Sequence, residues 1–177
     1  MVATGISLLN KMMIFLNRQI NADPRFNSPA ELDYFMSDFE YTEFDGLMSP
    51  DQVFRTESGS CHDQVMFEYD ELSKQGVNPR AKFLIAVGDD GNGGETHSFV
   101  YYSEDSTMFW FEQAWQDYAG IHDFATEQEM FDFIIDAFIN RNPNKHIYIA
   151  DFIPSDHTVG ENLQTLVDIC METAVEV

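Results

Sequence analysis

The residue with the clearest capacity for chemistry is Cys61, which the sequence puts at the start of a predicted helix. Ser60 precedes it as a helix N-cap, and Asp63 stands three residues after Ser60, where it can close a capping box. A helix N-terminus offers unpaired N–H groups and a positive dipole end, and both favour a thiolate. The pattern therefore predicts a candidate nucleophile. The sequence leaves an alternative open, a buried cysteine that only packs in the core.

A histidine and a glutamate lie downstream on two predicted strands, residues 96–102 and 107–113. The four residues 103–106 between them fit a hairpin loop. A hairpin symmetric about this loop pairs His97 with Glu112 on one face, where opposed Cβ atoms lie about 4.5–5.5 Å apart. A carboxylate beside an imidazole orients the ring and stabilises its charged form. The alternative is an ordinary His–Glu pair at a sheet edge.

The predicted face around His97 is rich in aromatic side chains. Strand alternation puts Trp110 on this face, and Trp115 follows just past the second strand. Aromatic walls bind extended peptides or side-chain stems by apolar contact. We therefore expect Trp110 and Trp115 to line a substrate-binding cleft. The predicted face consists of His97, Phe99, Tyr101, Met108, Trp110 and Glu112.

Length and composition favour one globular domain over residues 1–177. The chain has 177 residues, of which 44% are hydrophobic, and 16 of them are Phe. No apolar run is long enough to cross a membrane, and the apolar stretch from Ile6 to Leu16 lacks a basic leader. Two cysteines make no disulfide framework, so we expect a reduced, cytoplasmic protein.

Charge is the strongest compositional signal, because 31 acidic residues stand against 9 Lys and Arg, for a formal charge of −22. Direct nucleic-acid binding needs basic clusters and is not expected. The acidity fits a cationic partner, a surface that mimics DNA, a salty cytoplasm, or solubility alone. The sequence does not indicate an oligomeric state.

Capping signals and periodicity predict the remaining elements. The loop from Gly88 to Gly94 is glycine-rich and acidic, but it lacks the ligand spacing of a calcium loop, and we interpret it as a mobile hairpin connection. Cys170 falls on an apolar helical stripe and is expected to be inert core. Helices are predicted over residues 4–20, from Ser28, from Ser49, from Thr126 to about Asn142 and from Thr158, and strands over 81–87, in a central position, and 147–152.

Several spaced motifs resemble the transglutaminase-like superfamily, particularly its small bacterial and phage members. A cysteine at a helix start, a histidine 36 residues later and an acid 15 residues beyond it also follow the order of a papain-like thiol site. The likeness spans about residues 47–135. It is carried by Met48-Ser49-Pro50-Asp51-Gln52-Val53, Gly59-Ser60-Cys61-His62-Asp63-Gln64-Val65, Thr96-His97-Ser98-Phe99-Val100-Tyr101, Trp110-Phe111-Glu112-Gln113-Ala114-Trp115 and Gly120-Ile121-His122-Asp123-Phe124.

The resemblance implies that Cys61 is the nucleophile, His97 the base and Glu112 the residue that orients the base. It also implies an α+β fold with a papain/transglutaminase-like core, in which the cysteine-bearing helix packs on an antiparallel β-sheet. Extra N- and C-terminal helices lie outside this core.

One departure concerns the position after the cysteine. Small members of the superfamily usually carry Trp there, whereas this chain has His62. A histidine at this position is expected to alter either the pKa of the thiol or the substrate groove, and we count it with the substrate-binding candidates. The Cys61 backbone N–H is one candidate oxyanion donor. Neither Gln52 nor Gln64 has the spacing or direction of a second donor, so that group has no sequence assignment.

The leading hypothesis is a thiol-dependent hydrolase or acyl transferase acting on amide bonds of peptides or proteins, basic ones included. It implies no cofactor and no metal. The second hypothesis is a non-enzymatic acidic protein on the same fold, which binds a basic partner or mimics nucleic acid. A third is a metal site formed by Cys61, His62, His97 and Glu112, although adjacent Cys-His ligands lack the usual spacer of a zinc site.

Overall fold

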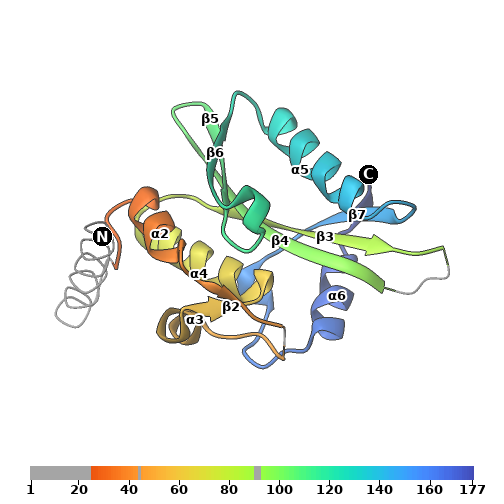
Figure 1. The fold of residues 1–177 in the computed structure, drawn as a ribbon, viewed down its shortest axis with the longest axis horizontal. Helices are drawn as coiled ribbons and strands as arrows, with labels where there is room; N and C mark the ends of the chain where they lie inside the picture. The colour runs from red at the N-terminus through yellow and green to blue at the C-terminus, as the bar shows by residue number, and fades with distance from the viewer. Residues whose placement is uncertain (1–24, 44, 90–92) are drawn as a thin grey trace, which may run out of the picture.

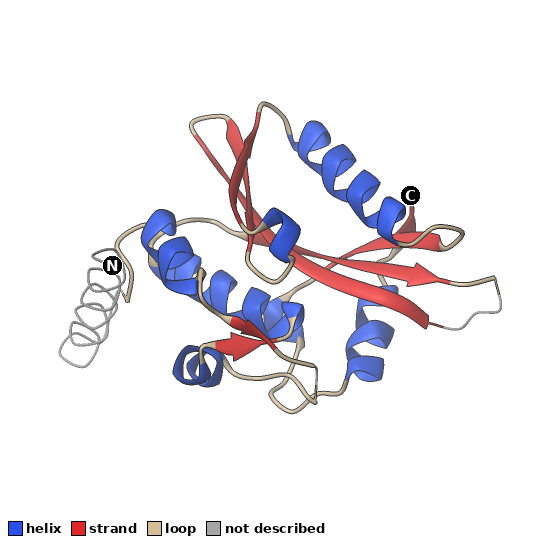
Figure 2. Cartoon of the chain, in the orientation of Figure 1, coloured by secondary structure: helices blue, strands red, loops and turns tan. Residues whose placement is uncertain are grey.

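The fold is organised on a six-stranded sheet in which all neighbouring strands are antiparallel (Figures 1 and 2). The computed structural model describes residues 25–43, 45–89 and 93–177. The strand order is β6-β5-β4-β3-β7-β8, so the predicted central strand is confirmed as β3 between β4 and β7. The strands are β3 (Arg80–Val87), β4 (Gly93–Glu104), β5 (Thr107–Glu112), β6 (Gly120–Phe124), β7 (His146–Asp151) and β8 (Val175–Glu176).

Helices cover both faces of this sheet, which makes the fold α+β (Figure 1). Helix α5 lies on one face, and α2, α3, α4 and α6 lie on the other. The predicted starts at Ser28, Ser49, Ser60 and Thr126 are confirmed, because each side chain accepts a hydrogen bond from its helix. The predicted helix over residues 4–20 lies outside the described residues. The helices are α2 (Pro29–Met36), α3 (Pro50–Thr56), α4 (Cys61–Lys74), α5 (Glu127–Arg141) and α6 (Leu163–Met171).

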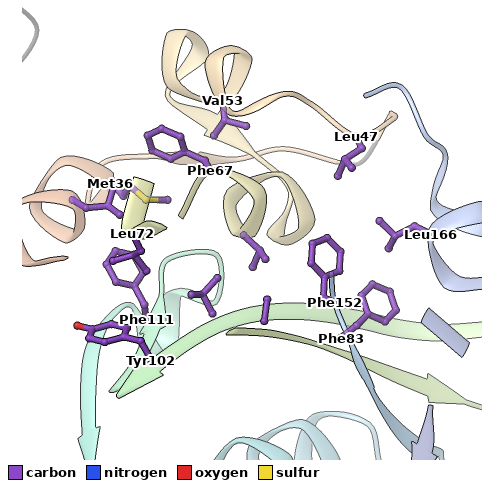
Figure 3. Packing of buried hydrophobic residues seen from close by; sticks show 14 of the residues in the cluster. Met36, Leu47, Val53, Phe67, Leu72, Phe83, Tyr102, Phe111, Phe152 and Leu166 are labelled. Carbon is purple, nitrogen blue, oxygen red and sulfur yellow. The ribbon is translucent and has the colours of Figure 1, made fainter. Parts of the chain in front are cut away.

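Each face of the sheet has its own hydrophobic core. The larger one lies between the sheet and α4, with α2, α3 and α6 around it, and it includes Phe67, Phe83, Phe111 and Phe152 (Figure 3). Cys170 is buried in this core, as predicted. The smaller core lies under α5 and contains Trp110, Met130 and Phe138, among others. None of the described helices combines the length and apolar character that a membrane crossing requires.

The predicted register of the β4–β5 hairpin is wrong by two residues. Tyr101 lies opposite Trp110 and Glu104 opposite Thr107, so the loop has two residues instead of four. Asp105 and Ser106 both have positive φ, 49° and 72°, as a type I′ turn requires. A shift of two preserves side-chain direction, so the predicted aromatic face is retained. The sequence lacks the Asn-Gly or Asp-Gly pair that identifies such turns.

The structure differs from the sequence interpretation in one helix boundary and in one pair of short strands. The last helix begins at Leu163 with Asn162 as its N-cap, because Thr158 instead donates its N–H to Glu161 in a turn (3.0 Å). Short strands β1 (Glu40–Tyr41) and β2 (Ser58–Gly59) form a parallel pair that no periodicity predicted. Single-turn helices η1 (Gln116–Tyr118) and η2 (Pro154–Asp156) complete the described elements.

The left-handed turn yields a stability prediction. Ser106→Gly should raise the free energy of unfolding by about 0.5–1 kcal/mol, because glycine adopts positive φ without the steric cost that a Cβ carries. Ser103→Gly, in the extended strand of the same hairpin, should instead lower it. Urea denaturation of the two variants measures both changes. A Ser106→Gly variant less stable than the wild type would contradict the type I′ assignment.

Candidate active site

The turn that carries the cysteine is fixed by the carboxylate of Asp63. Asp63 Oδ2 accepts hydrogen bonds from the N–H (2.9 Å) and hydroxyl (2.8 Å) of Ser60, which completes the predicted capping box. Its other oxygen accepts from the Met48 N–H (2.7 Å). A Cβ on Gly59 would lie 2.8 Å from the Asp63 Cβ, so only glycine admits this close approach. The network holds Cys61 at the first position of α4, where its N–H has no intrahelical acceptor.

His97 on β4 and Glu112 at the end of β5 meet beside this turn. Nε2 of His97 lies 2.8 Å from Glu112 Oε2, and both side chains are buried. Oε1 of Glu112 accepts the N–H of Trp115 (2.7 Å), so both carboxylate oxygens have partners. With Nε2 engaged, Nδ1 of His97 is the ring nitrogen left to interact with the Cys61 thiol, whose influence helps to raise the pKa of His97. The two residues thus lie together, diagonally rather than directly opposed.

The electrostatics of this pair favour a thiolate and an imidazolium. Burial raises the pKa of Cys61, but the charges of His62 and His97 and their hydrogen bonds with the sulfur outweigh it and lower the pKa to about 5. Burial lowers the pKa of His97, but the charge of Glu112 and the hydrogen bonds with Cys61 and Glu112 raise it to about 10. At neutral pH the sulfur is therefore negative and the imidazole positive.

A cavity of about 410 Å³ opens over the thiol where β5 leaves β4. The ladder between these strands ends at the pair Val100–Phe111, and the chain beyond Glu112 turns away into η1. The start of β4 is therefore unpaired on this side, next to the cavity that Cys61 lines with an exposed fraction of 3%. The cavity is lined by Tyr41, Cys61, Glu95, Thr96, His97, Ala114, Trp115, Gln116, Asp117, Phe138 and Arg141.

The three candidate substrate-binding residues occupy different places. Trp115 lines the cavity, and its ring meets the His97 ring edge-on at 5.1 Å. Trp110 has no exposed surface and lies in the core under α5, so its position does not support a role in lining the cleft. His62 is 98% buried and does not line the cavity, so its position does not support contact with substrate either.

His62 instead packs beside the thiol from within the protein. Its Nε2 lies 3.7 Å from the Cys61 sulfur and 3.2 Å from the Thr96 hydroxyl oxygen. Its Nδ1 hydrogen-bonds with the Ser98 hydroxyl (2.7 Å), and the ring stacks on Phe83 at 5.0 Å. The sulfur thus has two imidazoles as neighbours. The position of His62 next to Cys61 in the sequence was the only signal for this.

Two further residues at the site were not identified from the sequence. Tyr41 lines the cavity beside Cys61; burial and the charge of Cys61 raise the pKa of Tyr41 to about 12. Glu68 is buried on α4, two helical turns after Cys61. Burial, and after it the charge of Glu112, raise the pKa of Glu68 well above its usual range.

Among the described residues, no group of three or more His, Cys, Asp or Glu side chains is arranged to hold a metal ion. The hypothesis of a metal site at Cys61, His62, His97 and Glu112 therefore has no structural support.

Comparisons with known proteins identify no family. No protein-family model and no curated protein matches the chain. Among solved structures, the chain is similar to one described as "Legionella pneumophila LapG (EGTA-treated)", with 14% sequence identity and a TM-score of 0.41. The match covers 81% of this chain and 76% of that one. A similarity of this size carries no conclusion about function, which must be argued from the site itself.

The lowered pKa of Cys61 and the raised pKa of Cys170 predict different reactivity for the two cysteines. Iodoacetamide should alkylate Cys61 at a nearly constant rate from pH 6 to 8, because its thiol, with a pKa of about 5, is already ionised there. Cys170 should stay unlabelled, because burial raises its pKa to about 12. Peptide mapping by mass spectrometry at each pH measures both rates.

The unfolded protein in denaturant is the internal control, since both thiols are then exposed and should react alike. Equal labelling of the two cysteines in the folded protein would contradict the assignment. A Cys61 rate that rises about tenfold per pH unit would also contradict it, because an unperturbed thiol behaves in that way.

Proposed function

We propose that this protein is a transglutaminase-like thiol enzyme that cleaves or transfers amide groups of peptides or proteins. The observation that carries the proposal is one arrangement: a thiol at a helix N-terminus, an imidazole that lines the same cavity, and a buried carboxylate 2.8 Å from that imidazole. These are the parts of a Cys-His-Glu triad, with Cys61 as nucleophile, His97 as acid and base, and Glu112 as orienting group. An antiparallel sheet that carries His97 on β4 and Glu112 on β5, with the cysteine helix α4 packed on one of its faces, fits a papain-like core.

The acylation half of the reaction follows from the resting charges. The Cys61 thiolate attacks the amide carbonyl carbon, a C–S bond forms, and the carbonyl π electrons move to oxygen. The His97 imidazolium then gives its proton to the departing nitrogen as the oxyanion collapses and the C–N bond breaks. The products are an amine and a Cys61 thioester, with His97 now neutral.

The second half regenerates the enzyme. Neutral His97 takes a proton from water, whose oxygen attacks the thioester; the C–S bond breaks and a carboxylic acid leaves. An amine in place of water gives a new amide, which is the cross-linking outcome. We favour hydrolysis, because it requires no second substrate to be bound at the cavity.

His97 is a better proton carrier than His62, although both contact the sulfur. Glu112 hydrogen-bonds to His97 as a carboxylate and stabilises the charge that the imidazole must carry. His62 has hydroxyl partners at both ring nitrogens and lies outside the cavity. A proton on His62 therefore has no direct path to a leaving group, and we assign His62 a role in holding the thiolate.

Substitution of the two histidines tests this assignment. His97→Gln should lower kcat for the best amide substrate of a peptide library by about 10²–10⁴-fold, the usual contribution of a general acid–base. His62→Gln should be less damaging and should mainly raise the pH at which iodoacetamide reaction of Cys61 begins. Rates come from mass-spectrometric detection of cleavage or deamidation.

His122→Gln is the matched control, because His122 lies outside the cavity beside Trp110. Its activity should be close to wild type. If His62→Gln loses more activity than His97→Gln, the base is His62. Cys61→Ala with wild-type activity would refute the thiol mechanism and leave the acidic binding protein as the better hypothesis.

The charges in the cavity support a preference for basic substrates. Glu95 and Asp117 contribute two carboxylates. Arg141 neutralises the charge of Glu95, because its Nε lies 2.6 Å from Glu95 Oε1. Asp117 is exposed and has no cationic partner among the described residues. It is therefore available to pair with a Lys or Arg side chain, while Trp115 packs against the aliphatic stem of that side chain.

The expected result is a mild preference for Lys- or Arg-rich peptides that weakens in about 0.5 M salt, where charges are screened beyond a few ångströms. Asp117→Asn should reduce the preference at low salt. Asp123→Asn, an exposed carboxylate that does not line the cavity, should not. Library profiling at both salt concentrations measures this. A preference for acidic peptides, or a basic preference that salt leaves unchanged, would contradict the role of charge.

A further inference from the structure

Tyr41 reaches the thiol from a segment well upstream of it. The parallel pair β1–β2 places Tyr41 opposite Gly59, two residues before Cys61. The backbone is fixed on both sides, because the Glu40 N–H donates to the Glu57 carbonyl (3.0 Å) and the Thr42 N–H to the Gly59 carbonyl (3.2 Å). The phenol is therefore held beside the cysteine turn rather than on a free loop.

The Tyr41 hydroxyl is a proton donor inside the cavity. The Tyr41 and Cys61 side chains line the same cavity, and the charge of Cys61 contributes to the raised pKa of Tyr41. Since its pKa is raised to about 12, the phenol keeps its proton throughout the pH range in which Cys61 is a thiolate. A phenol that faces a thiolate donates its O–H to the sulfur.

We propose that the Tyr41 hydroxyl, together with the Cys61 backbone N–H, forms the oxyanion hole of this site; the inference rests on the proposed acyl-transfer function. In the tetrahedral adduct, sulfur and oxygen are bonded to the same carbon. A donor that lines the same cavity as the sulfur is therefore also placed near the oxygen. Negative charge passes from sulfur to oxygen during the attack, so the donor stabilises the charge where it develops.

Other donors near the thiol are already engaged or out of reach. Gln64 Nε2 donates to the Gly59 carbonyl (2.9 Å), and Gln52 belongs to the capping box of α3. The Trp110 indole N–H is buried in the core under α5. Gln116 lines the cavity from η1 and is the one amide side chain there, so it is the competing candidate that the experiment must include.

The test compares two reagents of Cys61, of which only one forms an oxyanion. Cys61 attack on p-nitrophenyl acetate passes through a tetrahedral oxyanion, whereas alkylation by iodoacetamide displaces iodide from a saturated carbon. Tyr41→Phe should slow acylation at least about 10-fold and leave the alkylation rate, taken on its pH-independent plateau, close to wild type. With an amide substrate the loss in kcat should approach about 10²–10³-fold.

Tyr34→Phe is the matched control, since Tyr34 is also a partly exposed tyrosine but lies on α2 and does not line the cavity. It should change neither rate. Gln116→Ala should have no effect on acylation. Thermal unfolding of each variant verifies that the fold is retained, which is expected because Tyr41→Phe removes only a hydroxyl.

Each other outcome overturns the inference in a distinct way. Equal slowing of acylation and alkylation would make Tyr41 a residue that positions the thiolate only. Unchanged acylation would mean that Tyr41 has no role in the reaction, and faster acylation would mean that its side chain blocks the cavity. A selective loss of acylation in Gln116→Ala would assign the oxyanion role to Gln116. A wild-type protein whose Cys61 is not acylated, with acylation equal to that of Cys61→Ala, would refute the proposed function itself.

Discussion

The buried pair of His97 and Glu112 is the interaction on which the site depends. A positive imidazole in the interior is stable only with a matched negative charge, and loss of one partner of such a pair costs about 3–5 kcal/mol. Glu112 supplies that charge at 2.8 Å and is itself held by the Trp115 N–H at 2.7 Å. The same balance appears at Glu68, whose pKa is raised by burial and, secondarily, by the charge of Glu112.

This pairing also explains the path of the chain after β5. Glu112 is the last residue of the strand, and its Oε1 binds the backbone just before η1. The carboxylate that orients His97 therefore also fixes the point at which the chain turns away from β4. That turn opens the cavity and brings Trp115 to its wall. One side chain thus links the charge of the site to its shape, so a substitution at Glu112 is expected to affect both.

Local signals in the sequence were sufficient for much of this arrangement. Helix caps at Ser60 and Thr126 were identified because a hydroxyl followed three residues later by an acidic residue has a specific hydrogen-bonding geometry. The face of the hairpin that carries His97 was correct because side-chain alternation has a period of two and does not depend on the loop. The register was wrong because Asp105-Ser106 adopts positive φ without glycine.

Non-local contacts account for what the sequence did not reveal. Tyr41 reaches Cys61 through a two-residue parallel bridge, too short to give any periodic pattern. The buried position of His62 depends on Ser98 and Thr96, which lie more than thirty residues away in the chain. Such contacts follow from how α4 docks on β4. Only the packed fold specifies that docking, so spacing along the chain cannot distinguish a ligand-facing histidine from an internal one.

The negative charge of the chain has two separate effects, a long-range field around the molecule and short-range pairing inside the cavity. A formal charge of −22 raises the local concentration of cationic molecules, but at physiological ionic strength this field decays over about 8 Å. It can speed encounter without selecting a side chain. Selection of a substrate side chain therefore depends on the cavity. There Arg141 neutralises Glu95 and stacks over Trp115 at 5.6 Å. Asp117 is then the cavity carboxylate available for pairing. A single exposed carboxylate gives modest energy, so shape and the aromatic wall must carry most of the discrimination among substrates.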